Sequence, residues 1–171
     1  MADFKVAFAK TIRFEGGYVN HKADKGGETY KGIARNFWPK WKGWGIIDGS
    51  VKNDKVLGSI PALQKLVEDF YKVNFWDAIN GDLIADQRAA DNIFDFAVNS
   101  GVKRAITYAQ LVVGATRDGV LGPITAKKIN GKHSFTTEYK KLRLDFVNKI
   151  VKNNPSQKVF LNGWTRRIND A

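Results

Sequence analysis

The fold of this chain is decided by residues 4–18, which read FKVAFAKTIRFEGGY. Apolar side chains recur along this stretch at helical intervals, at Phe4, Ala7, Phe8 and Ile12. This spacing predicts an amphipathic first helix. Because Glu15 is followed by two glycines, we expect the helix to end near Glu15.

The position of Glu15 in that helix suggests a chemical role. At roughly 100° per residue, Glu15 lies within about 20° of Phe4 and of Phe8 on the helical wheel. Burial and the partial negative charge of a helix C-terminus both disfavour a carboxylate, so we expect a raised pKa and a general acid. In the alternative interpretation, Glu15 pairs with Lys10 or Arg13 and only tethers the helix end.

The segment after the first helix is rich in glycine and polar residues. Tyr18 to Gly32 is typical of turns or a short hairpin. It carries Asp24 and Thr29, which with Glu15 form a set of one acid, a second carboxylate and a hydroxyl within fifteen residues. Such a set suits glycoside hydrolysis, in which one group protonates the leaving oxygen and another stabilises charge or activates water. Alternatively, Asp24 is an Asx-turn residue and Thr29 a strand residue.

The remainder of the chain is expected to be largely helical. Helical patterns begin at Pro61, at Asp86 or Asp91, at Val102, at Pro123 and at Tyr139. Residues 37–58 combine tryptophans with glycines, which favours a long ordered loop. The sequence therefore predicts a mainly α fold with a small β or turn element after the first helix.

Composition favours a single compact domain over residues 1–171. Hydrophobic residues make up 43% of the chain and aromatic residues 12%, which is enough for one sizeable core. With no cysteine and two histidines, no disulfide or structural zinc site is expected. His21 and His133 lack a ligand cluster, and we expect neither a metal nor a cofactor.

The formal net charge of +11 indicates a polyanionic partner or surface, although such a charge also serves solubility. A nucleic-acid binder is one alternative, but no nucleic-acid motif supports it. Neither a signal peptide nor a membrane anchor is visible, so we expect synthesis in the cytoplasm.

Two runs of sequence resemble a known family. The first comprises Glu15-Gly16-Gly17-Tyr18-Val19-Asn20, Ala23-Asp24-Lys25-Gly26-Gly27-Glu28-Thr29 and Gly32-Ile33. It is similar to the signature of glycoside hydrolase family 108, lysozyme-like N-acetylmuramidases of phage endolysins and bacterial genomes. The second comprises Phe94 to Gly101, Ala109-Gln110 and Asp118 to Thr125, and it resembles the segment, often described as peptidoglycan-binding, that follows in that family.

The resemblance implies an α+β lysozyme-like fold, with a catalytic segment over residues 4–92 and a helical, peptidoglycan-binding-type segment over residues 93–168. It also implies cleavage of the β-1,4 bond after N-acetylmuramic acid, with Glu15 as the essential acid. Asp24 and Thr29 are similar to the carboxylate and threonine of other phage lysozymes, although the spacing before Thr29 is shorter by one residue. His21, Lys22, Lys25 and Tyr30 depart from the residues commoner at those places.

Five residues are expected to contact the glycan: Tyr18, Asn20, Tyr30, Asp95 and Asn99. Tyr18 would form a platform for a sugar ring, and Asn20 would donate to an N-acetyl group. Each has a structural alternative, since Tyr18 could pack inward and Asn20 could hold a turn. Asp95 and Asn99 lie one helical turn apart and could equally form a buried hydrogen-bonding pair.

Basic residues cluster towards the C-terminus, at Lys140, Lys141, Arg143, Lys149, Lys152 and Arg166-Arg167. They form either a solvated helix face or a patch that contacts anionic outer-envelope lipid. Together with Glu15, the resemblance implies a monomeric peptidoglycan hydrolase that acts on the wall in the periplasm after release, as in phage-type host lysis. The alternative is a module that binds peptidoglycan without cutting it.

Overall fold

The computed structural model describes residues 1–20 and 26–171. It is mainly helical with one small antiparallel sheet after the first helix, which confirms the predicted fold class. Two compact units are present: Met1–Thr11 with Val73–Ala171, and Ile12–Lys72. The boundary predicted between residues 92 and 93 falls inside a helix, and the two predicted segments stay a prediction.

The first helix is shorter than predicted. α1 spans Phe4–Ile12, and the backbone N–H of Glu15 donates to the carbonyl of Ile12 over 3.1 Å, which closes a turn beyond the helix. The chain must reach an extended strand by Tyr18, so the residues after Ile12 form this turn in place of another helical turn. The helical-wheel argument for Glu15 is therefore wrong, because Glu15 is not part of the helix.

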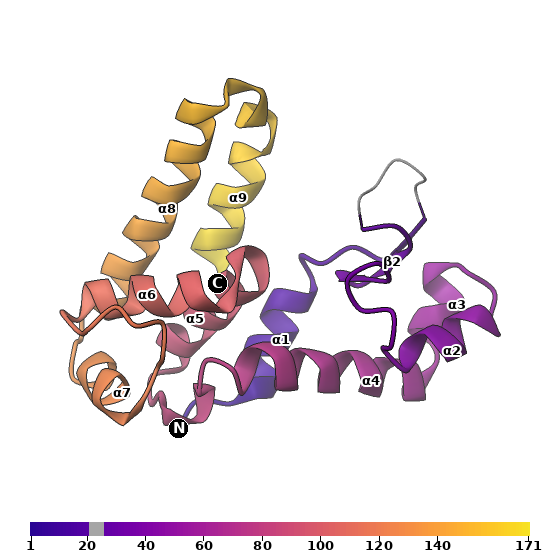
Figure 1. Cartoon of the computed structure of the whole chain (residues 1–171), viewed down its shortest axis with the longest axis horizontal. Coiled ribbons are helices and arrows are strands. Elements are labelled where there is room, and N and C mark those ends of the chain that lie inside the picture. The colour runs from indigo at the N-terminus through magenta and orange to yellow at the C-terminus, as the bar shows by residue number, and fades with distance from the viewer. Residues whose placement is uncertain (21–25) are drawn as a thin grey trace. The chain divides into compact units, whose positions relative to one another are not determined.

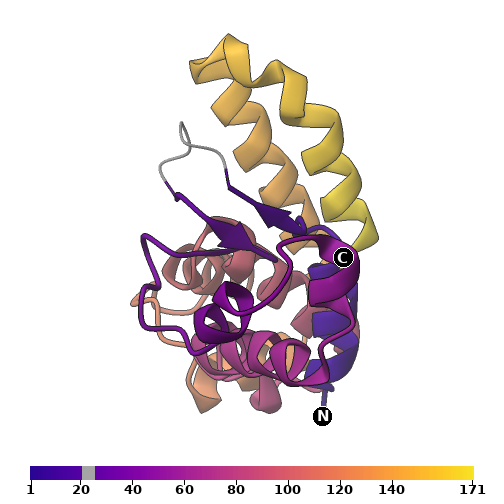
Figure 2. The same cartoon turned by 90° about the vertical axis from the view of Figure 1, so that its right-hand side faces the viewer.

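The unit Ile12–Lys72 contains a three-stranded antiparallel sheet, drawn as dark purple arrows in Figure 2. Its strands are β1 (Tyr18–Val19), β2 (Thr29–Tyr30) and β3 (Ile33–Ala34). Between β2 and β3, Lys31 and Gly32 form a two-residue loop with φ of 44° and 76°. Two successive positive φ values are typical of a type I′ hairpin turn, in which glycine is favoured.

Residues 37–58, predicted to be a loop, contain two short helices. They are α2 (Gly43–Asp48) and α3 (Asp54–Gly58), followed by α4 (Pro61–Tyr71). Trp44 and Ile47 bury the inner side of α2, and the side chain of Asn53 caps α3 by accepting from the N–H of Val56 over 2.9 Å. Tertiary burial and a cap thus stabilise helices too short to show a periodic pattern.

The other unit is built from helices around a buried α5. After η1 (Lys72–Trp76) and η2 (Gly81–Leu83) come α5 (Gln87–Ser100), α6 (Val102–Val112), α7 (Pro123–Asn130), α8 (Phe135–Asn153), η3 (Pro155–Gln157) and α9 (Lys158–Asp170). Asp86, one of the two predicted starts, caps α5, and Pro123 opens α7 as predicted. Figure 1 shows α8 and α9, in orange and yellow, side by side as a helical hairpin.

Aromatic packing ties the start of the chain to this unit. The ring of Phe4 lies 5.7 Å from that of Trp76 and 5.9 Å from that of Phe94, edge to face in both pairs. Trp76 and Phe94 are fully buried. Within the described residues, no helix is both long and apolar enough to cross a membrane.

A buried ion cluster fixes the helical hairpin to α5. Asp95 accepts from Arg143 of α8 and, over 2.8 Å, from Arg167 of α9. The Asp95 and Arg143 side chains are only 1% exposed. The expectation that Arg143 and Arg167 belong to a basic outer face is therefore wrong, because both are turned inward to neutralise a buried carboxylate.

Candidate functional site

The carboxylate of Glu15 lies directly against the β2–β3 turn. A Cβ atom placed on Gly32 would be 2.7 Å from Oε2 of Glu15 and 2.6 Å from the hydroxyl oxygen of Tyr71. Only a residue without a side chain allows both groups to approach the backbone this closely. Glu15 itself is half-buried.

Hydrogen bonds that involve side chains of α4 hold the β2–β3 turn in place. The buried Tyr71 of α4 donates its hydroxyl to the carbonyl of Lys31 over 2.7 Å. The ammonium of Lys31 donates to Oε1 of Gln64 over 2.7 Å, and the amide of Gln64 donates to the hydroxyl of Tyr30 over 3.0 Å. Burial lowers the pKa of Lys31 from its ordinary value. The turn opposite Glu15 is therefore fixed by a connected polar network.

Tyr30 is part of this support. Its side chain is fully buried, and its hydroxyl is bonded to Gln64. Burial raises the pKa of Tyr30, which keeps the phenol neutral. The predicted contact between Tyr30 and substrate finds no exposed ring surface here, because this side chain packs inward under the sheet.

A second glycine sets the path of the chain just after Glu15. The Asp54 carboxylate lies against the Cα of Gly17 and accepts from the backbone N–H of Tyr18 over 2.5 Å. The backbone N–H of Lys31 donates to the carbonyl of Gly17 over 3.2 Å. The Glu-Gly-Gly-Tyr motif thus has a structural explanation: its second glycine lets the strand pass close to α3 and beside the β2–β3 turn.

Tyr18 belongs to a charged network centred on Glu28. Its hydroxyl donates to Oε1 of Glu28 over 2.7 Å, and Lys52 donates to the same oxygen over 2.8 Å. Arg35 lies 2.7 Å from Oε2 of Glu28 and bridges to Asp48 through both terminal nitrogens. Tyr18 is thereby held half-buried at the edge of the sheet.

The protonation states in this network follow from its geometry. Burial alone would raise the pKa of Glu28, but hydrogen bonds from Lys52 and Tyr18 and the charge of Arg35 bring it below its ordinary value. Burial and the bonded Glu28 carboxylate raise the pKa of Tyr18. Glu28 is therefore an ionised structural carboxylate at neutral pH.

The structure describes the remaining predicted residues of this unit in part. Asp24 lies outside the described residues. Thr29 sits on β2, half-buried, with its hydroxyl donating to the carbonyl of Gly27 over 3.2 Å. Asn20 is exposed just after β1, and its side chain forms a hydrogen bond with that of Tyr18.

Asp95 and Asn99 lie on α5, in the unit that contains Val73–Ala171. Asp95 is buried, as the structural alternative expects, but its partners are Arg143 and Arg167 and not Asn99. Asn99 is exposed one turn further along the helix, and its side chain oxygen accepts from the hydroxyl of Ser100 over 3.0 Å. The two side chains thus have different environments.

Several residues around Glu15 were not predicted from the sequence. The folded chain brings four residues to the Glu-Gly-Gly-Tyr motif: Gly32, Asp54, Gln64 and Tyr71. Their proximity could not be inferred from the sequence, because Tyr71 and Gln64 lie more than thirty positions away. One local signal was available. A glycine in a two-residue gap between short β-prone pairs indicates a tight hairpin turn and hence a close backbone approach.

The described residues hold no group of three or more histidines, cysteines, aspartates or glutamates placed to bind a metal. An open hollow of about 830 Å³ lies between α6 and α7, lined in part by Val112, Ile124 and Lys127. It contains none of the predicted catalytic or glycan-contacting residues.

Comparison with known proteins is consistent with the motif and the fold. The sequence model described as Glycosyl hydrolase 108 matches residues 8–101, more than half of the chain. The chain belongs to glycosyl hydrolase family 108. As a member of family 108 it is a glycoside hydrolase, and the matched region contains Glu15 and the whole sheet.

A solved structure extends the similarity beyond the region matched by the family 108 model. The structure of SagA from Brucella abortus aligns with a TM-score of 0.68 at 28% identity, covering 97% of this chain and 89% of that one. No curated protein matches the chain.

Proposed function

We propose that this chain is a peptidoglycan hydrolase that cleaves the β-1,4 bond between N-acetylmuramic acid and N-acetylglucosamine, with Glu15 as the general acid. The observation that carries the proposal is the placement of the Glu15 carboxylate against Gly32, in a family of glycoside hydrolases. A half-buried carboxylate fixed against rigid backbone is suited to protonating a leaving oxygen.

The proposed chemistry needs a second group besides the acid. Asp24 would stabilise the developing positive charge or orient water, and Thr29 would help to place that water. Tyr18 opens β1 and Asn20 follows it, and both would contact the sugar rings. The proton donated by Glu15 goes to the glycosidic oxygen as the bond between this oxygen and the anomeric carbon breaks. Water supplies the hydroxyl group of the new reducing end, and its other proton restores the acid form of Glu15.

The test is digestion of purified peptidoglycan by the wild-type protein and by Glu15→Gln, followed by mass analysis of the products. We expect new muramic acid reducing ends from the wild type and a loss of at least ~10²-fold in rate for the variant, the size of a general-acid contribution. A Glu15→Gln protein with full activity contradicts the mechanism. Binding without any new reducing end would support the alternative, a non-catalytic peptidoglycan-binding module.

The cellular role follows from the substrate. The wall lies outside the inner membrane, so the proposed enzyme, made in the cytoplasm, would act in the periplasm after release, as in phage-type host lysis. Expression with a permeabilised inner membrane should lyse the host, and expression of Glu15→Gln should not.

A contact with anionic envelope lipid is a second proposal, favoured by the end of the α8–α9 hairpin. From Phe146 to Asn169 the chain has no acidic residue. Lys149, Lys152 and Lys158 are exposed there, beside Val159 and Phe160, which are 78% and 53% exposed. We call these five residues the hairpin tip. Cations around protruding apolar side chains suit an anionic lipid surface.

Vesicle binding tests this proposal with a charge-matched control. Changing Lys149, Lys152 and Lys158 to Gln should abolish binding to vesicles rich in anionic lipid, whereas changing the exposed Lys5, Lys42 and Lys55 to Gln removes the same charge elsewhere and should preserve most of it. Equal losses in both triple variants would mean that net charge alone is responsible, and would reject the hairpin tip as a site.

A further inference from the structure

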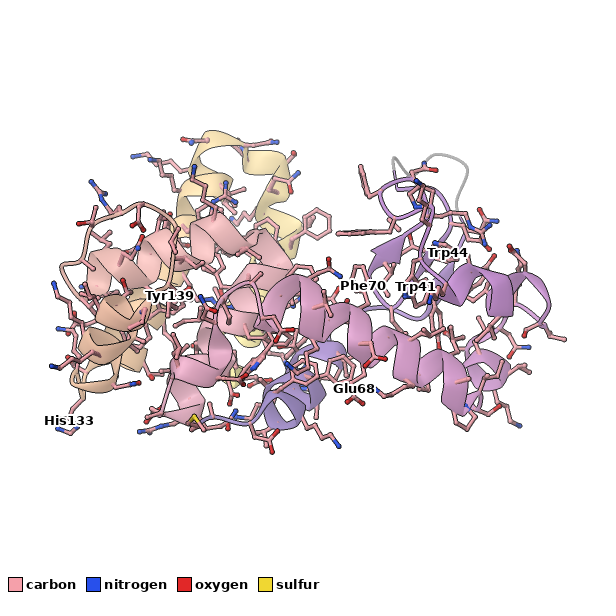
Figure 3. All side chains as sticks on the ribbon, turned by 60° about the horizontal axis from the view of Figure 1, so that its bottom comes forward. Trp41, Trp44, Glu68, Phe70, His133 and Tyr139 are labelled. Carbon is pink, nitrogen blue, oxygen red and sulfur yellow. The ribbon has the colours of Figure 1, made fainter. Side chains whose placement is uncertain are left out.

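An aromatic hollow on the unit Ile12–Lys72 has no assigned role. It has a volume of about 380 Å³ and is lined by Phe37, Trp38, Pro39, Lys40, Trp41 and Phe70. Figure 3 shows Trp41 and Phe70 close together in this part of the molecule, with Trp44 beside them. Ligand sites are typically concave and lined by aromatic side chains with a few polar groups.

The rings of this hollow are held in place by the fold. The ring of Trp38 stands edge to face against that of Phe70, with their centroids 4.8 Å apart. The backbone carbonyl of Trp38 accepts from the indole N–H of Trp44 over 2.8 Å. The indole N–H of Trp41 donates to the carbonyl of Leu66 over 3.3 Å. The surface is therefore preorganised, which lowers the entropic cost of binding.

Two of the rings are not needed to complete the core. Phe37 is 69% exposed and Trp38 is 41% exposed, although they are neighbours in sequence and line the same hollow. Scattered exposed apolar side chains are normal, but aromatic ones gathered around a hollow mark a binding surface.

The surroundings favour a sugar ring over a membrane as occupant. Of the residues that the structure describes, Lys40 is the one charged residue in the lining, whereas binding to anionic lipid typically uses a cluster of basic residues. Aromatic rings offer flat apolar faces on which the C–H face of a pyranose can stack, and Lys40 can donate hydrogen bonds to hydroxyl or N-acetyl oxygens.

The hollow also lies close along the chain to the turn that faces Glu15. Phe37 is five positions after Gly32, so their Cα atoms are at most ~18 Å apart along an extended chain. The backbone N–H groups of Phe37 and Trp38 both donate to the carbonyl of Ala34, the last residue of β3. A glycan strand lying at Glu15 therefore has further sugar rings within reach of the hollow.

We propose that the hollow formed by Phe37, Trp38, Trp41 and Lys40 is an auxiliary subsite that binds a sugar ring of the glycan strand at a distance from the cleaved bond. The inference rests on the proposed function, because it takes the substrate to be a glycan. It adds a site that grips the strand by stacking and does not take part in bond cleavage.

The experiment measures binding of a chitin hexasaccharide, an N-acetylated β-1,4 glycan, to Glu15→Gln protein by calorimetry. Adding Phe37→Ala should weaken binding about tenfold, the effect of losing roughly 50 Å² of apolar contact. Trp38→Phe keeps the packing against Phe70 and should weaken binding less. Val51→Ala, at a residue of the same unit that is 65% exposed and outside the hollow, should leave binding unchanged.

The outcomes separate this subsite from the proposed activity. Unchanged hexasaccharide binding in Phe37→Ala overturns the subsite, even if the wild type cleaves peptidoglycan. Conversely, a wild type that produces no new reducing ends while Phe37→Ala loses binding keeps the subsite and rejects the hydrolase. If Phe37→Ala instead loses binding to neutral vesicles and not to the hexasaccharide, the hollow is a lipid site and the inference is wrong.

Discussion

The Glu15 carboxylate and the Cα atom of Gly32 are so close that a single methyl group between them would lie 2.7 Å from Oε2 of the acid. Gly32 also has a φ of 76°, a conformation that side chains with a Cβ rarely adopt. The position of the acid thus depends on a residue seventeen places away in the sequence.

Gly32→Ala should therefore impair activity more than stability. The methyl group would push aside the Glu15 carboxylate and the Tyr71 hydroxyl, and the strained turn would cost about 1–2 kcal/mol in unfolding free energy. We expect a fall of at least ~10-fold in kcat, since small misplacements of reacting groups are costly. Initial rates on purified peptidoglycan and thermal unfolding measure the two effects.

Gly45→Ala is a suitable control for this prediction. Among the described residues, nothing outside the neighbouring residues and backbone of its own helix lies within 4 Å of a Cβ placed on Gly45. This glycine is inside α2, where alanine is the better helix former. Its activity should equal that of the wild type. A Gly32→Ala protein that behaves the same way would show that the acid does not depend on this approach.

Asp95→Asn should act on stability and spare the glycan affinity. The variant leaves two buried arginines without their carboxylate, and breaking such a pair typically costs about 3–5 kcal/mol. KM for peptidoglycan should stay within about twofold of the wild type below the melting temperature, because kinetic constants report a binding role separately from folding. Rates and thermal unfolding of the same preparation test both expectations.

Asn99→Ala provides the comparison, because Asn99 is exposed on the same helix. If Asn99 contacts the glycan, as the sequence predicts, this variant should raise KM with little loss of stability. A raised KM in folded Asp95→Asn would instead return Asp95 to the substrate-contacting set.

The fold class was accessible from the sequence because the helices show a clear apolar period and because the Asp86 cap and the first-turn Pro123 mark helix starts. The end of α1 was not predictable from the sequence, because Arg13 and Phe14 have a composition typical of a helix but lie in a turn. α2 escaped detection because its stability comes from burying Trp44 and Ile47, a tertiary effect without a local pattern.

For the same reason, only part of the candidate site was predictable from the sequence. Glu15 stood out through its motif, whereas Gly32 and Tyr71 acquire their roles only when the sheet brings them to the acid. For Arg143 the sequence-based prediction was wrong. Its charge suggested an exposed face, but its partner Asp95 lies 48 residues away and inside the core. Long-range pairing of this kind leaves no local trace in the sequence.

Stability should fall in acid through Glu28. The pKa of this carboxyl is lowered in the folded chain relative to its ordinary value of 4.5, so the unfolded chain takes up the proton first as the pH falls. The stabilisation is fully present above pH 4.5 and is lost as the pH drops through the lowered value. Melting temperatures between pH 6 and pH 3 should therefore decline less steeply in Glu28→Gln than in the wild type.

Lys52→Gln tests the cause of that shift. It removes one of the two hydrogen bonds to Oε1 of Glu28 but leaves the bond from Tyr18, so its acid sensitivity should lie between those of the wild type and Glu28→Gln. Parallel melting curves for all three proteins would show that Glu28 is not the group responsible.

Asp24→Asn should reduce kcat by about 10²-fold or more with little change in KM, if Asp24 stabilises charge that develops only in the transition state. Thr29→Ala should lose less, and Thr29→Ser should recover activity because it keeps the hydroxyl that places water. In a Glu15→Gln background, Asp24→Asn should add little further loss in rate, since the effects of groups that act as one unit are not additive.

Initial rates measure these effects. Proton NMR of the first product anomer distinguishes direct attack by water from a covalent intermediate on Asp24. Full additivity of the two substitutions would mean that Asp24 and Glu15 act in separate steps, and an unchanged kcat in Asp24→Asn would remove Asp24 from the mechanism.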